Sequence, residues 1–338
     1  MKIAVDAMGG DNAPLAIVNG ALVAAPHVDG EIILVGDTDA IKKCFPSSVP
    51  KNIRIVHATE TIEMDESPVD ALRKKRDSSL LVAAMMVKNG EADGMLSAGN
   101  TGAAAAAAHL NWKCLPGISR PAIATTFPSK KGKFILIDSG AIPDSDARNL
   151  SEYAFMGSLY AQTVLKIRAP KVGLLNIGEE ETKGNKLTKQ AYKLLKESLP
   201  NFAGNVEGKD LFKGDFEVVV CDAFVGNVVL KNTQGIVEFM WEIFKNTFPK
   251  NLITKSIVFW LSKKGLMEAK RRMDYSEIGG APLLGVNGLC MICHGRSNAK
   301  AIKNAILMSQ QEYKHNLNKL IIEKASEYET PKEGANVS

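Results

Sequence analysis

Short runs of aliphatic and β-branched residues alternate with longer amphipathic stretches along most of the chain. The short runs have the length and composition of buried strands, and the longer ones have the apolar spacing of helices. The predicted strands are Lys2–Val5, Glu31–Val35, Ile53–His57, Gly94–Ser97, Ala122–Thr126, Phe134–Ile137, Lys171–Leu175, Phe202–Val206 and Glu217–Cys221. The predicted helices span 14–25, 67–89, 102–112, 147–166, 186–198, 227–247 and 298–325.

This alternation predicts an α/β fold, in which a doubly wound and mainly parallel sheet carries helices on both faces. Asn12 and Ser67 each stand within two residues of a following proline and predict helix starts with a capping side chain. Neither a low-complexity linker nor an internal repeat divides the chain. We therefore expect one domain over residues 1–325 and a flexible tail over 326–338.

Composition and charge narrow the classes of function. Charged residues make up 23% of the 338 residues and the formal net charge is only +5, so we expect no nucleic-acid partner. The first apolar run, Ile3 to Val5, is too short for a signal peptide, and no apolar run reaches the ~18 residues of a membrane span. The five scattered cysteines are typical of reduced thiols. A cytoplasmic protein is the expectation.

Polar or glycine-rich turns follow five of the predicted strands, at residues 6–11, 97–102, 138–142, 176–185 and 222–227. Ligands of open α/β sheets bind at the carboxyl ends of the strands. These five turns therefore predict one shared site.

Three of the turns carry candidate chemistry, each with a plainer alternative. Ser97–Gly102 could cradle a phosphate, because glycines allow close approach and free amides at a helix start attract anions. It could equally be a tight turn in which Asn100 or Thr101 only caps the helix. Lys183 could hold an anionic substrate, or belong to a solvated charged loop. Asn227 could be catalytic, or only cap the following helix.

Several common active-site patterns are absent. No two of the 28 glycines are separated by a single residue, so the dinucleotide-binding fingerprint is missing. The P-loop, the serine-hydrolase elbow and the zinc-protease motif are missing too. Cys290–His294 fits the C-x-x-C-H pattern of haem attachment, but its apolar residues are also those of a buried strand. We expect no cofactor and no metal.

A basic segment, residues 251–273, carries the same net charge of +5 as the whole chain. It combines cations with a large apolar side chain at Trp260, as in a helix on an anionic membrane surface or against an acidic partner. An ordinary surface helix packed in a dimer is the alternative. The residues expected to make this contact are Lys255, Trp260, Lys263, Lys264, Arg271 and Arg272.

The turns described above also carry a family resemblance. The motifs are Lys2–Asp11, Ser97–Gly102, Val172–Gly178 with Lys183–Asn185, Asn205–Glu207, Tyr275–Glu277 with Gly279–Ala281, and His294–Gly295. In this order, from residue 1 to about 325, they resemble the bacterial phosphate acyltransferases of phospholipid synthesis. The resemblance implies a two-lobed fold similar to phosphotransacetylases and isopropylmalate dehydrogenases, usually in a homodimer.

The resemblance also implies the reaction: acyl-carrier protein and inorganic phosphate give acyl phosphate and free carrier. The product then feeds a membrane-bound glycerol-phosphate acyltransferase, which suits weak peripheral association with the inner face of the membrane. By motif, the family's catalytic lysine and asparagine correspond to Lys183 and Asn227. The residues expected to bind phosphate or the acyl donor are Asp6, Gly9, Gly10, Ser97, Gly99, Asn100, Thr101, Gly102, Asp138, Asn176, Gly178, Asn185, Asp222 and His294.

Our mechanistic hypothesis places phosphate at the helix start that follows Ser97, with Lys183 neutralising it and Asn227 donating to the thioester oxygen. Asp6 and Asp138 are expected to orient other groups rather than act as bases. His294 could protonate the departing thiolate, or be a structural histidine at a strand end.

Two positions depart from the family pattern. Ile142 stands where the family usually has asparagine, and Ala223 where it usually has glycine. The first puts any binding role of position 142 in doubt, and the second could tighten the turn before Asn227.

Overall fold

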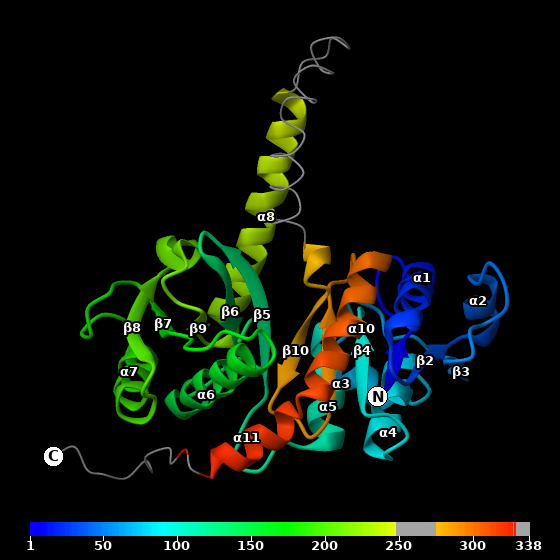
Figure 1. Ribbon diagram of the computed structural model, residues 1–338, viewed down its shortest axis with the longest axis horizontal. Helices are drawn as coiled ribbons and strands as arrows, with labels where there is room; N and C mark the ends of the chain where they lie inside the picture. The colour runs from blue at the N-terminus through cyan, green and yellow to red at the C-terminus, as the bar shows by residue number, and fades with distance from the viewer. Residues whose placement is uncertain (248–274, 327, 329–338) are drawn as a thin grey trace.

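The computed structural model describes residues 1–247, 275–326 and 328. One eleven-stranded sheet runs through two lobes (Figure 1), in the order β3-β2-β1-β4-β11-β10-β5-β6-β9-β7-β8. The strands are β1 (Lys2–Asp6), β2 (Glu31–Gly36), β3 (Ile53–His57), β4 (Gly94–Ser97), β5 (Ala122–Ser129), β6 (Gly132–Ile137), β7 (Val172–Asn176), β8 (Phe202–Glu207), β9 (Val218–Val220), β10 (Gly280–Leu284) and β11 (Leu289–Cys293). Most neighbouring strands are parallel, which confirms the predicted fold class.

Helices cover both faces of this sheet in each lobe (Figure 1). The described helices are α1 (Leu15–Ala24), α2 (Thr38–Lys43), α3 (Pro68–Lys74), α4 (Ser79–Lys88), α5 (Thr101–Trp112), α6 (Ala147–Thr163), α7 (Lys186–Ser198), α8 (Ala223–Thr247), α10 (Ala299–Lys314) and α11 (Leu317–Ala325), with short 3-10 turns at Ala25–His27, Gly208–Lys213 and Tyr275–Glu277.

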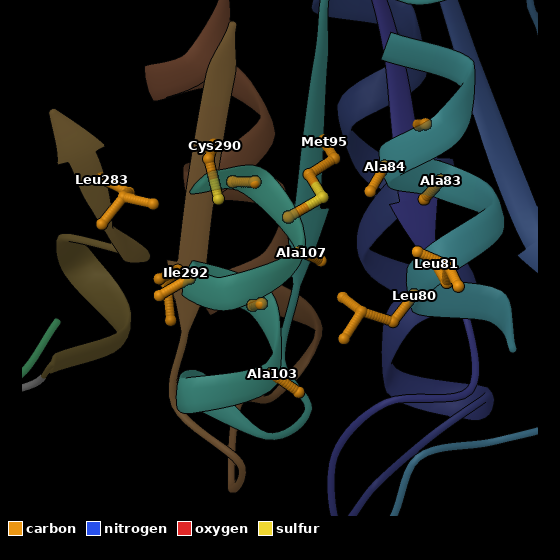
Figure 2. Packing of buried hydrophobic residues seen from close by; sticks show 14 of the residues in the cluster. Leu80, Leu81, Ala83, Ala84, Met95, Ala103, Ala107, Leu283, Cys290 and Ile292 are labelled. Atoms are coloured by element: carbon orange, nitrogen blue, oxygen red, sulfur yellow. The ribbon is translucent and has the colours of Figure 1, made fainter. Parts of the chain in front are cut away.

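Successive side chains of a strand point to opposite sides of the sheet, and β1, β2, β4 and β11 of the first lobe are largely buried on both faces. Ile3 and Val5 of β1 lie in the core formed with α1 and α10, whereas Ala4 between them lies in the core formed with α4 and α5. Figure 2 shows the second of these cores, where Leu80 of α4 and Ala107 of α5 lie near Met95 and Cys290. The alanines of α5 allow it to lie close to the sheet.

The second lobe repeats this arrangement with the parallel strands β6, β9, β7 and β8. Leu174 and Val220 pack with α6, α7 and α11 on one face. Leu175 and Cys221 belong to the smaller core on the other face, which Leu230 of α8 covers.

Antiparallel strands join the two parallel halves. The ladder between β10 and β5 consists of two residue pairs, Leu283 with Ile123 and Leu284 with Ala122. The sequence did not predict β10, because Pro282 and the three glycines within residues 279–285 favour a turn over a strand. The buried-strand interpretation of Cys290–His294 is confirmed by β11.

Several helix boundaries differ from the prediction. The predicted helix 67–89 is two helices, α3 and α4, and the predicted helix 298–325 is broken between α10 and α11 at Asn316, whose φ is +49°. Asparagine tolerates this left-handed conformation better than most residues, so it can end one helix and precede the next. The predicted helix at 227 begins earlier, at Ala223, and α2 was not predicted.

The two predicted capping side chains do not cap. The Ser67 side chain makes no capping hydrogen bond to α3, although that helix begins at Pro68 as expected. The Asn12 amide instead donates to the backbone oxygens of Arg296 and Ser297, at 3.3 and 3.5 Å. This long-range contact with the loop after β11 has no local signal in the sequence.

The basic segment 251–273 lies outside the described residues, and so do its predicted contact residues. Among the described residues, no helix is both long and apolar enough to cross a membrane. Of the predicted flexible tail, Ser326 and Tyr328 are described. The Tyr328 ring stacks on Phe155 with centroids 4.6 Å apart, and its hydroxyl lies 2.6 Å from the Ser151 hydroxyl. The chain is therefore held by the second lobe as far as Tyr328.

Candidate active site

The first lobe is organised at its strand ends by the carboxylate of Asp6, which is 2% exposed. It accepts hydrogen bonds from the hydroxyls of Ser79 (2.6 Å) and Ser97 (2.7 Å), and from the amides of Gly9 (3.1 Å) and Met8 (3.2 Å). Burial raises the pKa of Asp6, and these four donors oppose that rise. Asp6 therefore joins β1, β4 and the start of α4 rather than facing a substrate.

Ser79 is the member of this network that sequence reasoning missed. Its partner Asp6 lies 73 residues earlier in the chain. A serine at a helix start is ordinarily read as a cap, so the local pattern does not point to a distant carboxylate.

The loops after β1, β4 and β11 touch through their backbones. A Cβ atom on Gly9 would lie 2.9 Å from the Gly99 nitrogen, and one on Gly10 would lie 2.9 Å from the Ala98 oxygen and 3.0 Å from the Gly295 oxygen. Gly10 also has a φ of +104°, a conformation that side chains disfavour. The sequence-predicted glycines therefore serve the close packing of three loops.

At the start of α5, the side chain of Asn100 is fully engaged. Its Oδ1 accepts from the Ala103 amide at 3.0 Å, and its Nδ2 lies 2.9 to 3.3 Å from three carbonyl oxygens within residues 63–66. These contacts favour the capping interpretation for this side chain. We find no hydrogen bond from the backbone amides of Thr101 and Gly102 within the described part of the chain, so these two donors are available to an anion.

His294 follows β11 and lies near α8. Its Nδ1 accepts from the Arg296 amide at 3.1 Å, which favours the structural interpretation. Burial, and after it the charge of Arg296, lowers the pKa of this imidazole. Arg296 also forms a 2.7 Å ion pair with Glu238 of α8, which ties the β11 loop of the first lobe to a helix that begins in the second.

Asp138 organises the second lobe as Asp6 does the first. One oxygen accepts from the amides of Ile123 (3.0 Å), Gly140 (3.0 Å) and Ala141 (2.9 Å), and the other lies 3.4 Å from the Ile142 amide. Burial raises the pKa of Asp138 to about 6. Position 142 contributes through its backbone, so its apolar side chain does not disturb this turn.

Asn227 lies on the first turns of α8, beside the Asp138 turn. A Cβ on Gly226 would lie 1.9 Å from the backbone carbonyl oxygen of Asp138, so the glycine allows α8 to contact the Asp138 turn. A Cβ on Gly140 would lie 3.5 Å from the Asn227 side chain. The side-chain amide of Asn227 is half-buried and has no hydrogen bond within the described residues. The Asp222 carboxylate caps the helix by accepting from the backbone amide of Val225 at 3.0 Å. The capping role therefore belongs to Asp222 and leaves Asn227 available.

The buried Ala223 is the first residue of α8 and is 3% exposed. Its methyl group is accommodated while the Asp222 cap is retained. Alanine at position 223 therefore does not prevent α8 from starting there.

Lys183 is exposed in the loop after β7, and its ammonium has no partner among the described residues. The amide of Asn176 donates to the Lys183 carbonyl at 3.2 Å, and Asn185 caps α7 by accepting from Thr188 at 2.9 Å. A Cβ on Gly178 would lie 2.9 Å from the Lys183 Cγ, so this glycine makes room for the lysine stem. The hydrogen bond from Asn176 therefore holds the Lys183 backbone, while the Lys183 ammonium has no partner among the described residues.

The sequence-predicted residues form separate groups linked by α8. Lys231 is one helical turn after Asn227, and its charge contributes to lowering the pKa of His294 in the other lobe. No contact among the described residues joins Lys183 to Asn227 or to Asp6. The hydrogen bonds of the described residues therefore gather the loops in separate groups rather than in one network.

The chemical character of these groups is clear. The two buried carboxylates are already surrounded by donors, and burial raises the pKa of the Cys221, Cys290 and Cys293 thiols. In the described residues, no group of three or more His, Cys, Asp or Glu side chains is placed to hold a metal ion. What remains available are donors and a cation, which suit a phosphate and a developing oxyanion.

Comparison with known proteins gives a consistent result. The family model for fatty acid synthesis proteins matches residues 1–320. A phosphate acyltransferase of Desulfitobacterium hafniense is 51% identical over 313 residues, which cover 92% of this chain and 93% of that protein. A phosphate acyltransferase of Pelotomaculum thermopropionicum is 48% identical over 318 residues, covering 94% and 93% of the two chains.

Solved structures of similar fold include a phosphotransacetylase from Streptococcus pyogenes, with a TM-score of 0.61, 18% identity and coverage of 92% of this chain and 93% of that one. A branched-chain phosphotransacylase from Enterococcus faecalis has a TM-score of 0.56 at 14% identity, with coverage of 92% and 98%. At these identities the likeness concerns the fold.

We expect Ser79→Ala to lower the free energy of unfolding by about 1–3 kcal/mol, because it leaves a buried carboxylate with one donor fewer. Urea unfolding would measure the change. Ser78→Ala is the matched control, since its hydroxyl donates at 2.9 Å to the neutral Lys75 carbonyl, and it should cost less. Equal losses would contradict the special role of the Asp6 network.

We also expect Asp138 to make stability fall with rising pH. Its folded-state pKa of about 6 exceeds the ordinary value of 3.8, so the folded protein holds the proton more tightly. Its contribution is therefore full below pH ~4 and lost as the pH rises through ~6. Asp138→Asn should remove this dependence.

Urea unfolding at several pH values between ~4 and ~7 would test this, with the exposed Asp65→Asn as control. The stability difference between wild type and Asp138→Asn should change by up to ~3 kcal/mol across this window, the equivalent of about two pKa units. A difference that is constant with pH would show that the Asp138 pKa is not raised.

Proposed function

We propose that this chain moves a fatty acyl group from an acyl-carrier-protein thioester to inorganic phosphate. The chain belongs to the fatty acid synthesis protein family, and its similar relatives are phosphate acyltransferases. The enzyme class, an acyltransferase, follows from the family. The carrier-protein donor, and the use of acyl phosphate for glycerol-phosphate acylation in phospholipid synthesis, are the finer parts of the proposal.

The observation that carries the proposal is that some polar groups at the strand ends have hydrogen-bond partners and others have none. The carboxylates of Asp6 and Asp138 are saturated by donors, whereas the Asn227 amide and the Lys183 ammonium have no partner among the described residues. Unpartnered donors beside carboxylates that are already hydrogen-bonded fit a reaction whose nucleophile, phosphate, is already anionic. Such a site has to hold the reactants together and stabilise charge.

In the proposed reaction, a phosphate oxygen attacks the thioester carbonyl carbon, and the carbon–sulfur bond then breaks to release the carrier thiolate. The amides of Thr101 and Gly102 bind phosphate at the start of α5, and Lys183 neutralises it. Asn227 donates to the carbonyl oxygen as it becomes negative, a contact whose loss costs about 3 kcal/mol in comparable sites. The thiolate takes its proton from solvent, and His294 keeps the structural role given by the contact of its Nδ1 with the Arg296 amide.

Partner contacts are proposed from the surface of α8, whose C-terminal end stands clear of both lobes (Figure 1). Ile236, Phe239 and Met240 are exposed by 54, 62 and 54%. Their spacing of three and four residues places them on one helical face, as in a helix that packs against a partner. This apolar face supports a homodimer. The adjoining basic segment supports weak contact with the inner face of the membrane in a cytoplasmic enzyme.

The reaction is tested with palmitoyl-acyl-carrier protein and inorganic phosphate, trapping acyl phosphate with hydroxylamine. We expect hydroxamate that depends on both substrates. Acetyl- and palmitoyl-coenzyme A are run beside it, and product from acetyl-coenzyme A alone would overturn the carrier-protein proposal. Product from no donor would overturn the acyl-phosphate reaction altogether.

For the assigned residues, we expect Asn227→Ala to lower kcat by about 100-fold, as for loss of an oxyanion donor. Lys183→Ala should raise the KM for phosphate and lower kcat, while Lys186→Ala, an exposed lysine three residues later, serves as the control. Steady-state kinetics at varied phosphate would measure both. Near-normal turnover of Lys183→Ala at saturating phosphate would refute the assignment.

The dimer proposal predicts that Phe239→Glu shifts the protein toward monomer, because a charge would be buried in an apolar contact. Light scattering after size exclusion would measure the mass, with the neighbouring exposed Glu242→Gln as control. A monomeric wild type would exclude the homodimer.

A further inference from the structure

Asparagines of two neighbouring strands hold the Lys183 loop, Asn176 by a bond to Lys183 itself and Asn205 by a bond to the Glu180 carbonyl. Asn176, at the end of β7, donates from Nδ2 to the Lys183 carbonyl at 3.2 Å. The Lys183 amide donates to the Glu180 carbonyl at 3.1 Å, and Asn205 of β8 donates to the same carbonyl at 2.9 Å. Asn205 thus holds the acceptor to which the Lys183 peptide is bonded.

Asn205 is an unusual choice for stability alone. It is 6% exposed, and its Oδ1 is buried without a donor in the described part of the chain. A buried carbonyl oxygen without a partner is costly, and an apolar side chain of the same shape avoids that cost. The single bond to Glu180 is therefore the contribution that this amide makes.

The reach of Lys183 depends on this tie. Its ammonium contacts no other described residue, so only the backbone anchor and the stem determine where the charge lies. The stem runs past Gly178, where a Cβ atom would lie 2.9 Å from Lys183 Cγ. A loop released at Glu180 would spread the ammonium over more positions and weaken its contact with an anion.

We propose that Asn205 is a positioning residue, which fixes the Lys183 loop through the Glu180 carbonyl and so sets the affinity of the enzyme for phosphate. This rests on the proposed function of Lys183. Asn205 touches neither reacting group, so its effect passes through the loop.

The test is Asn205→Leu, which keeps the shape, removes the donor and removes the unpartnered oxygen. We expect the Tm to be unchanged or higher, the KM for phosphate to rise about tenfold, and the KM for the acyl donor to stay within about twofold. Hydrogen exchange at the Lys183 amide should become about tenfold faster, because its acceptor is no longer held. Asn205→Ala provides the same measurements if the leucine variant does not fold.

The matched control is Asn201→Leu, just before the same strand. Its Nδ2 donates to the Ser158 hydroxyl at 2.9 Å and to the Pro170 carbonyl at 2.6 Å, away from the loop. It should lower the Tm and leave both the phosphate KM and the exchange of the Lys183 amide unchanged.

The proposal is overturned if Asn205→Leu lowers the Tm while the phosphate KM and the Lys183 exchange stay at their wild-type values, which is the signature of a merely structural residue. Amide exchange needs no substrate, so it judges the tie to Lys183 even if the wild type forms no acyl phosphate. Unchanged exchange refutes the tie; faster exchange in an enzyme without acyl-phosphate activity leaves the tie and refutes only the proposed function.

Discussion

A carboxylate can remain inside a protein only where hydrogen-bond donors replace the water that it has lost. Asp6 and Asp138 meet this requirement with four donors each, drawn from different segments of their lobes. Satisfying the charge therefore fixes the course of the surrounding loops. The close backbone contacts of Gly9 and Gly226 and the position of Asn227 depend on loops that are gathered in this way.

This requirement also explains why polar residues at strand ends have different tasks. Asp6, Asn100 and Asp222 use their oxygens on backbone or hydroxyl donors within the fold. Lys183 and Asn227 lie beside such residues but have no partner within the described chain. A conspicuous polar motif in the sequence is thus largely scaffold, and the groups left for chemistry are the few that the scaffold does not use.

The sequence predicted the strands and the loops that follow them well, because alternate burial and strand-end turns are local patterns. Lys2–Val5 and Gly94–Ser97 are strands at those positions, extended by one residue at Asp6. The pattern could not reveal β10, whose proline and glycines resemble a turn, or the pairing of Ser79 with Asp6 across 73 residues. It marked Asn205 as part of a motif, but its task depends on which carbonyl lies nearby after folding.

The two-pair ladder between β5 and β10 bears on how the lobes move. Rotation about the chain direction is resisted by inter-strand hydrogen bonds, so a sheet twists most readily where its ladder is shortest. Among the described strands, β5 and β10 are joined by the fewest residue pairs, so the sheet resists twisting least at this ladder. A small rotation at this ladder changes the distance between the start of α5 and Asn227 without changing any hydrogen bond around Asp6 or Asp138. Movement between the lobes at this ladder then requires no unfolding of either lobe.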